Sequence, residues 1–216
     1  EGVIEQLGLS HVANVVSDLE ADDVIEIVQE LDSAEREEVL DALSDDDRTM
    51  VEEGLSYPED SAGRLMQRSV VVMASHWSVG QAIDFLREAE DLPRDFYDIF
   101  LVGSNQRPIG AIPLSRILAT RRHVAFSALM IADLKLIPVD MDQEKVAFLF
   151  SQRDLISAPV VDDSSSLVGV ITVDDIVDVI HEEHEEDIMR LGGVGEEDDL
   201  FAAVLDTTRS RFVWLL

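Results

Sequence analysis

Cysteine is absent from the sequence, and basic residues are few. Without cysteine the protein has no disulfide framework, no thiolate metal site and no cysteine nucleophile. Only 16 lysine and arginine residues stand against 46 aspartate and glutamate residues, which gives a formal net charge of −30. Nucleic acid and anionic membrane surfaces are therefore poor partners. Self-repulsion on this scale also predicts a stability that depends on cations, although a halophilic surface would give the same count.

A long apolar run is also missing. No window of about 18 apolar residues occurs, and the first residues are acidic and amphipathic, so we expect a soluble polypeptide without a signal peptide. Near the end, however, Arg209 and Arg211 precede an apolar run from Phe212 to Leu216. This pattern is typical of the cytoplasmic end of a transmembrane helix, although a C-terminal amphipathic helix gives the same pattern.

Enzyme motifs are absent too, so an enzyme is not expected. There is no Ser/His/Asp or Cys/His constellation and no phosphate-cradling GxxxxGK loop. The segment from His181 to His184 resembles the zinc-binding HExxH motif but is one residue too short. These two histidines would need a third nitrogen or thiolate ligand to hold a transition metal, and none is evident.

The first quarter of the chain has the apolar spacing of short helices. Apolar residues recur every three or four positions, for example from Val24 to Leu31. Ser33 and Asp45 stand where N-caps are expected, each followed by acidic residues. We therefore predict a stack of short antiparallel helices resembling part of a helical solenoid. A linker is expected from Tyr57 to Met66, because proline and glycine interrupt the helical spacing there.

A tandem repeat follows this linker. The first copy is predicted to run in the order strand, helix, strand, strand and helix, at residues 70–72, 79–88, 99–102, 109–112 and 114–119. The second copy repeats this order at residues 136–139, 143–150, 158–161 and 167–171, followed by an acidic helix. Two β-α-β-β-α units of about 60 residues each predict an α/β fold built on an internal repeat.

The acidic helix is unusual in its charge. Thr172 stands at its N-cap position, and acidic residues fill its first turn, where the helix dipole favours them. The helix is expected to end in the acidic block from His181 to Asp187, where the dipole opposes negative charge. At about 100° per residue, several acids lie within an arc of roughly 80°. One interpretation is a solvated acidic face, and the other is a site for a hard cation such as Mg²⁺ or Ca²⁺.

Specific strings within this pattern resemble a known family. The segment from Gly169 to Asp175, which closes the second copy, resembles a CBS-domain pair. Further strings resemble the cytosolic part of the MgtE family of magnesium transporters; they are Tyr57 to Met66, Asp142-Gln143-Glu144, Thr172 to Ile188 and Arg211 to Leu215. The resemblance implies an all-α part and an α/β part. These are a truncated helical N domain (1–56), CBS repeats at 57–124 and 125–188, and a connecting, or plug, helix (189–216) that leads to the first membrane helix.

The resemblance also implies a function. A homodimeric Mg²⁺ channel on the cytoplasmic face of the cell membrane would close when Mg²⁺ binds acidic residues of this region, and the transmembrane domain would lie outside this chain. Ca²⁺ or Mn²⁺ could take the place of Mg²⁺. The implied metal ligands, none of them catalytic, are Asp22, Glu26, Asp142, Glu144, Asp154, Asp175, Asp178, Glu183, Glu186 and Asp187.

CBS pairs generally bind adenine nucleotides, and the resemblance raises that possibility here. In the first copy, Pro113 stands where serine or threonine is usual and Arg116 where a ribose-binding aspartate would stand. In the second copy Thr172 and Asp175 keep ATP or AMP binding possible. The alternative function is therefore an adenine-nucleotide-sensing CBS module of another protein.

Overall fold

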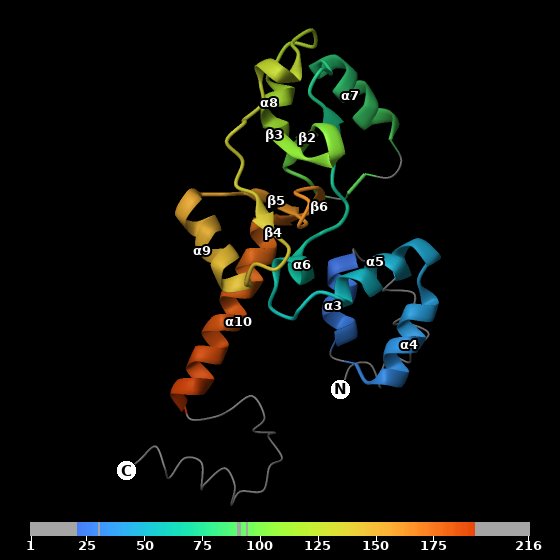
Figure 1. Cartoon of the computed structure of the whole chain (residues 1–216), viewed down its shortest axis with the longest axis vertical. Helices are drawn as coiled ribbons and strands as arrows, with labels where there is room; N and C mark the ends of the chain where they lie inside the picture. Colours follow the sequence, from blue (N-terminus) through green and yellow to red (C-terminus); the bar gives the residue numbers. More distant parts are fainter. Residues whose placement is uncertain (1–20, 30, 90–91, 94, 193–216) are drawn as a thin grey trace, which may run out of the picture.

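The computed structural model describes residues 21–29, 31–89, 92–93 and 95–192 (Figure 1). Two units, each built on a three-stranded sheet, form the larger part of this region, and three further helices lie to one side of them. The C-terminal string from Arg211 to Leu215 and most of the expected plug helix lie outside the described residues.

The predicted tandem β-α-β-β-α repeat is confirmed. The first unit contains β1 (Val72–Ala74), α7 (Val79–Glu88), β2 (Asp98–Val102), the short 3₁₀ turn η1 (Ser104–Gln106), β3 (Pro108–Pro113) and α8 (Leu114–Leu118). A second 3₁₀ turn, η2 (Phe126–Ala128), leads to the second unit, which contains β4 (Ile137–Pro138), α9 (Gln143–Arg153), β5 (Ser157–Val161), β6 (Leu167–Thr172) and α10 (Val173–Gly192). In both sheets the first strand is parallel to the second, and the second is antiparallel to the third.

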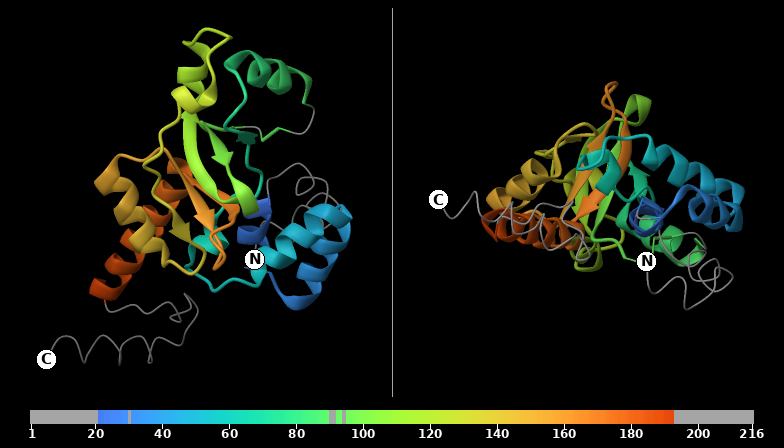
Figure 2. Two further views of the ribbon diagram at one scale, coloured as in Figure 1. Left: turned by 45° about the horizontal axis from the view of Figure 1, so that its top comes forward. Right: turned by 90° about the horizontal axis from the view of Figure 1, so that it is seen from below.

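The two sheets match in detail. Each antiparallel pair has a register shift near the end of its middle strand, after Leu101 in one sheet and after Val160 in the other. Buried apolar residues from both sheets, Phe100, Ala111 and Val170, form a small core shared by the two units. Ser166 at the β5–β6 turn also donates a hydrogen bond to the carbonyl of Asn105 in the first unit (2.9 Å). The repeats therefore pack as a pair (Figure 2).

The expectation of a linker from Tyr57 to Met66 is wrong. This segment forms the short helix α6 (Ala62–Leu65), and Ala62 and Met66 are completely or almost completely buried in the core of the second sheet. Backbone hydrogen bonds join Gln67 to Val170 of β6 in both directions (2.8 and 2.9 Å). In the same way, Ile131 joins Ala111 of β3 (2.8 and 3.0 Å). The segment that precedes each repeat thus completes the sheet of the other repeat.

One glycine permits this exchange. A Cβ atom added at Gly169 would lie 2.5 Å from Sδ of Met66 and 2.8 Å from the carbonyl oxygen of Gln67. A side chain at this position would separate the incoming segment from β6, so the close approach of the two backbones requires glycine.

The helical part of the chain is also confirmed where it is described. It contains α3 (Ala21–Gln29), α4 (Ser33–Ala42) and α5 (Asp45–Leu55), which pack around a core of Val24, Val28, Val39 and Val51. The N-caps differ by one residue from the prediction: Asp32 and Ser44, not Ser33 and Asp45, accept hydrogen bonds from the first turns. Asp32 forms a capping box with Glu35, because the acidic side chain three residues after the cap accepts a hydrogen bond from the backbone N–H of the cap residue.

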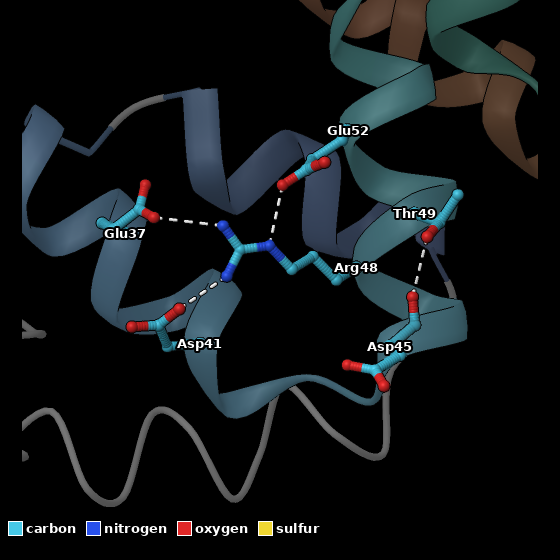
Figure 3. Close-up of polar contacts among 6 residues, drawn as sticks. All are labelled: Glu37, Asp41, Asp45, Arg48, Thr49 and Glu52. Atoms are coloured by element: carbon cyan, nitrogen blue, oxygen red, sulfur yellow. Dashed lines mark hydrogen bonds and ion pairs between the residues drawn. The ribbon is translucent and has the colours of Figure 1, made fainter.

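A single arginine joins α4 to α5 (Figure 3). The guanidinium of Arg48 donates hydrogen bonds to Glu52 (2.7 Å), Glu37 (3.0 Å) and Asp41 (2.5 Å). These hydrogen bonds, led by the one to Glu52, raise the pKa of Arg48. One basic side chain thus lies among three acids of two adjacent helices.

The acidic block from His181 to Asp187 does not lie at a helix end, which corrects the expectation. Helix α10 (Val173–Gly192) continues for five residues after the block, so the block lies near the middle of the helix. The residues after the block include Ile188 and Met189, which extend the helix as a partly exposed apolar segment.

Candidate functional site

The start of α10 holds a compact polar cluster. The backbone N–H of Thr172 donates to the carboxylate of Asp175 (2.7 Å), and its side-chain hydroxyl hydrogen-bonds both Asp174 and Asp175. Nε2 of Gln67, from the segment that completes this sheet, also donates to Asp175 (3.3 Å). Asp175 therefore accepts a hydrogen bond from the backbone N–H of the residue at the N-cap position, as the third residue of a capped helix often does.

Burial controls the charge of Asp175. Removal from water raises the pKa of Asp175 to about 6, and the nearby charge of Asp174 adds to this effect. The hydrogen bonds from Thr172 and Gln67 oppose the change, because they stabilise the ionised carboxylate. Thr172 itself is only 4% exposed, so this pair lies inside the protein beside the contact between the repeats.

A narrow hollow opens next to this cluster, between the two repeats; its volume of about 10 Å³ leaves room for about one water molecule. Among the residues that line it are the polar side chains of Gln67, Asp98, Ser157 and Thr172. The hydroxyl of Ser157 donates to the carboxylate of Asp98 (2.5 Å), which joins the first residue of β5 to the first residue of β2. Polar and apolar residues line this hollow in similar measure, and in this structure it is much smaller than a usual small-molecule site.

The predicted metal ligands of α9 lie at its two ends. Asp142 is the N-cap and accepts a hydrogen bond from the backbone N–H of Lys145 (3.2 Å), while Glu144 is exposed in the first turn. Asp154 ends the helix in the left-handed conformation, with φ of 52°, and is also exposed. A helix of 11 residues is about 16 Å long, so one ion cannot bind both ends within one chain.

The remaining predicted ligands lie on α3 and α10. Asp178 is exposed and Glu183 is half-buried on α10. Asp22 and Glu26 are placed on α3, and Glu186 and Asp187 on α10, but their side chains lie outside the described set. His181 and His184 are both exposed. Within the described part of the chain, no three acidic or histidine side chains converge to form a group that could hold a metal ion.

Comparison with known proteins shows which families this chain is similar to. A model of the MgtE intracellular N domain matches residues 1–60, and a model of the CBS domain matches residues 126–182. The magnesium transporter MgtE of Thermus thermophilus is 33% identical over 168 residues, which cover 77% of this chain and 37% of that protein. MgtE of Bacillus subtilis is 26% identical over 162 residues, which cover 75% of this chain and 36% of that protein.

A solved structure decides the assignment. The crystal structure of the cytosolic domain of the Mg²⁺ channel MgtE in complex with ATP matches with a TM-score of 0.76 at 30% identity, covering 82% of this chain and 72% of that one. The chain belongs to the MgtE family. It aligns with the cytosolic domain of that family, and its fold is a tandem CBS pair preceded by a helical segment. None of the helices in the described part is long and apolar enough to cross a membrane.

In this MgtE-family chain, two residues lie at the candidate site that the sequence analysis did not predict there. Gln67 contacts Asp175 from a distant segment, and Asp98 pairs with Ser157 across the repeats. The only available signal was positional, because Asp98 and Ser157 occupy equivalent places at the start of the middle strands. Of the predicted site residues, the structure brings together Thr172 and Asp175, while the described metal-ligand candidates stay dispersed.

Proposed function

We propose that this chain is the Mg²⁺-sensing regulatory region of a magnesium transporter or channel, and that Mg²⁺ binding closes the pore when Mg²⁺ is high. The proposal is carried by exposed acids at both ends of α9 and on α10, in a chain of net charge −30 that belongs to the MgtE family. Two carboxylates about 4 Å apart repel by roughly 4 kcal/mol at an effective dielectric constant near 20, and a bridging divalent cation reverses that sign.

Dispersed carboxylates suit Mg²⁺ if different bodies bring them together. Mg²⁺ prefers oxygen ligands and keeps several waters, so one or two carboxylates from each body are sufficient. Acids of α3 (Asp22 and Glu26) would approach those of the second repeat when the helical N domain docks, and Ca²⁺ or Mn²⁺ could substitute. The full set of proposed ligands is Asp22, Glu26, Asp142, Glu144, Asp154, Asp175, Asp178, Glu183, Glu186 and Asp187.

The proposal includes partners that lie outside this chain. The chain spans little more than a third of the curated relatives it matches, 36% and 37% of their length. We place the transmembrane domain in the remainder, joined through the predicted plug helix at 189–216, with this region on the cytoplasmic face. A homodimer is favoured by exposed apolar side chains such as Phe85 (43% exposed) and Phe148 (65% exposed) on the CBS helices.

A thermal titration tests Mg²⁺ sensing. The melting temperature of the wild-type chain should rise with MgCl₂ at constant ionic strength, following the linkage relation for a ligand of the folded state. The double variant Glu144→Gln/Asp178→Asn should lose much of this rise. The double variant Glu88→Gln/Asp163→Asn removes the same charge from exposed positions outside the proposed sites and is the matched control. Equal increments in all three proteins, or an equal increment with NaCl alone, would contradict the proposal.

The adenine-nucleotide function is favoured by one specific observation. Thr172 lines the hollow between the repeats and is hydrogen-bonded to Asp175, and a solved relative was crystallised with ATP. Titration with ATP or AMP in EDTA, separately from Mg²⁺, distinguishes the two functions. A thermal response to nucleotide that Thr172→Val abolishes, without any response to Mg²⁺ alone, would make the nucleotide the primary ligand.

A further inference from the structure

The contact between α4 and α5 carries far more negative than positive charge. Helix α4 contains four acidic residues and α5 contains five, against one arginine in each helix. Arg36 of α4 is engaged elsewhere, because its Nε donates to the carbonyl oxygen of Val28 on α3 (3.3 Å). The compensation of negative charge between α4 and α5 therefore falls to Arg48.

Each nitrogen of the Arg48 guanidinium has a different carboxylate as its partner (Figure 3). Nε donates to Glu52, one turn later on the same helix (2.7 Å). Nη1 donates to Asp41 (2.5 Å) and Nη2 to Glu37 (3.0 Å), both on α4. Glu37 and Asp41 are four residues apart, a spacing at which two like charges destabilise a helix. The planar guanidinium thus offsets repulsion both within α4 and between the two helices.

Dissolved ions can reach this cluster. The side chains of Glu37, Asp41 and Glu52 are 64%, 67% and 53% exposed, whereas that of Arg48 is 31% exposed. Three carboxylates and one guanidinium leave an excess of negative charge, which attracts cations from solution. Access therefore does not decide whether a dissolved cation bridges these acids. The position that the guanidinium already occupies decides it.

A divalent cation is the alternative means of holding such carboxylates together. Mg²⁺ and Ca²⁺ take oxygen ligands, and Mg²⁺ keeps several waters, so a hydrated ion can bridge acids that it does not contact directly. Here the guanidinium stands between the three carboxylates. Accordingly, among the residues that the structure describes, no three acidic or histidine side chains come together in a group that could hold a metal ion. Arg48 takes the place of a bridging ion, with the difference that it cannot dissociate.

We propose that Arg48 is a covalently attached counter-ion that makes the contact between α4 and α5 independent of Mg²⁺. It keeps Glu37, Asp41 and Glu52 out of the cation response, so that Mg²⁺ acts on acids elsewhere in the chain. Arg48 is in this sense a specificity-determining residue for sensing, and to that extent the inference rests on the proposed function. It concerns the interior of the helical part of the chain and not how that part sits on the CBS pair.

Hydrogen exchange over residues 33–55, measured by mass spectrometry on the full chain, tests this inference. Without divalent cations, Arg48→Gln should speed exchange in α4 and α5 by about fivefold, since exposed pairs of this kind contribute little each but three are lost together. MgCl₂ added at constant ionic strength should reverse this loss, because hydrated cations then take the vacated place. Docking of the helical part would protect both proteins alike, so the difference between variant and parent isolates the contact between α4 and α5.

Matched variants separate the effect of charge from that of structure. Arg48→Lys keeps the positive charge and should show little of the gained Mg²⁺ response. Arg48→Gln/Asp41→Asn also removes one of the repelling carboxylates and should lose most of that response. Arg87→Gln removes the same charge from an exposed position on α7 and should behave as the parent does.

The test remains decisive if Arg48→Gln does not fold without divalent cations. In that case MgCl₂ should restore its helical circular dichroism, whereas NaCl at equal ionic strength should not. An equal Mg²⁺ effect on residues 33–55 in the parent and in Arg48→Gln, or no recovery of an unfolded variant, would overturn the inference. A parent that shows no Mg²⁺ response anywhere, beside a variant that gains one, would refute only the sensing proposal.

Discussion

Replacing Asp175 by asparagine should remove a specific part of the pH dependence of folding. The carboxyl is largely buried at the start of α10, and burial raises its pKa from 3.8 to about 6. A raised pKa means that the folded state binds the proton more tightly than the unfolded chain does. The stability contributed by this proton is fully present below pH 3.8 and is lost as the pH rises through about 6.

The size of the effect follows from the shift. A change from 3.8 to about 6 corresponds to roughly 3 kcal/mol of unfolding free energy over the whole window, at 1.36 kcal/mol per pH unit. Near pH 4 the acidic chain approaches zero net charge and precipitation is a risk, so the range from pH 5 to pH 8 is preferable. Within that range the linkage relation gives a loss of about 1.4 kcal/mol in the wild type.

Urea denaturation in EDTA at several pH values measures this loss. The many other acids affect wild type and variant alike, so the quantity to compare is the difference in unfolding free energy between them. Relative to the wild type, Asp175→Asn should become more stable by about 1.4 kcal/mol on going from pH 5 to pH 8. Asp178→Asn removes the same charge from an exposed position on the same helix and controls for the loss of charge. If both variants show the same trend with pH, burial is not what controls Asp175.

Two further substitutions test the packing and the charge distribution. Gly169→Ala should destabilise the chain by about 1–3 kcal/mol, because its Cβ would overlap Met66 and the backbone of Gln67. The control in the same urea assay is Gly103→Ala, whose Cβ would lie 3.2 Å from a methyl of Ile109 and 3.9 Å from the carbonyl oxygen of Arg107. Equal losses in the two variants would contradict this reason. Arg48→Gln should lower the melting temperature at low salt by leaving three acids uncompensated, and the loss should shrink in high salt; exposed Arg87→Gln is the control, and a salt-independent loss would contradict the charge argument.

Local signals were sufficient to predict most of the repeat. The predicted bounds of α7 agree with the structure because Ser78 and Gln81 form a capping box at its start. Runs of β-branched residues separated by polar turns likewise located β5 and β6 to within one residue. In these elements the cap, the spacing of apolar residues and the turn all agree, which is the condition under which sequence specifies structure.

The prediction from sequence failed where long-range packing outweighs local signals such as proline and glycine. Pro58 and Gly63 are typical of a linker, but Gly63 instead makes room for the ring of Tyr57 while Ala62 enters a core formed about 75 residues later. The hydrogen bond from Gln67 to Asp175, 108 residues apart in sequence, has no local signal at all. The metal ligands remain a prediction, because the acids that would form the proposed site lie apart on separate elements in the described part of the chain.

The placement of basic residues connects these observations. In the described part of the chain, ion pairs of arginine occur within the helical unit at Arg48, at its joint at Arg64 and Arg68, and in the first repeat at Arg122. The acidic face of α10 retains exposed carboxylates such as Asp178. Arginine thus pairs with acids at contacts between elements, while carboxylates of α10 remain exposed, as the proposed Mg²⁺ sensing requires. Monovalent salt would screen that repulsion but could not coordinate two carboxylates, so a response to millimolar Mg²⁺ at fixed ionic strength is the behaviour this charge distribution favours.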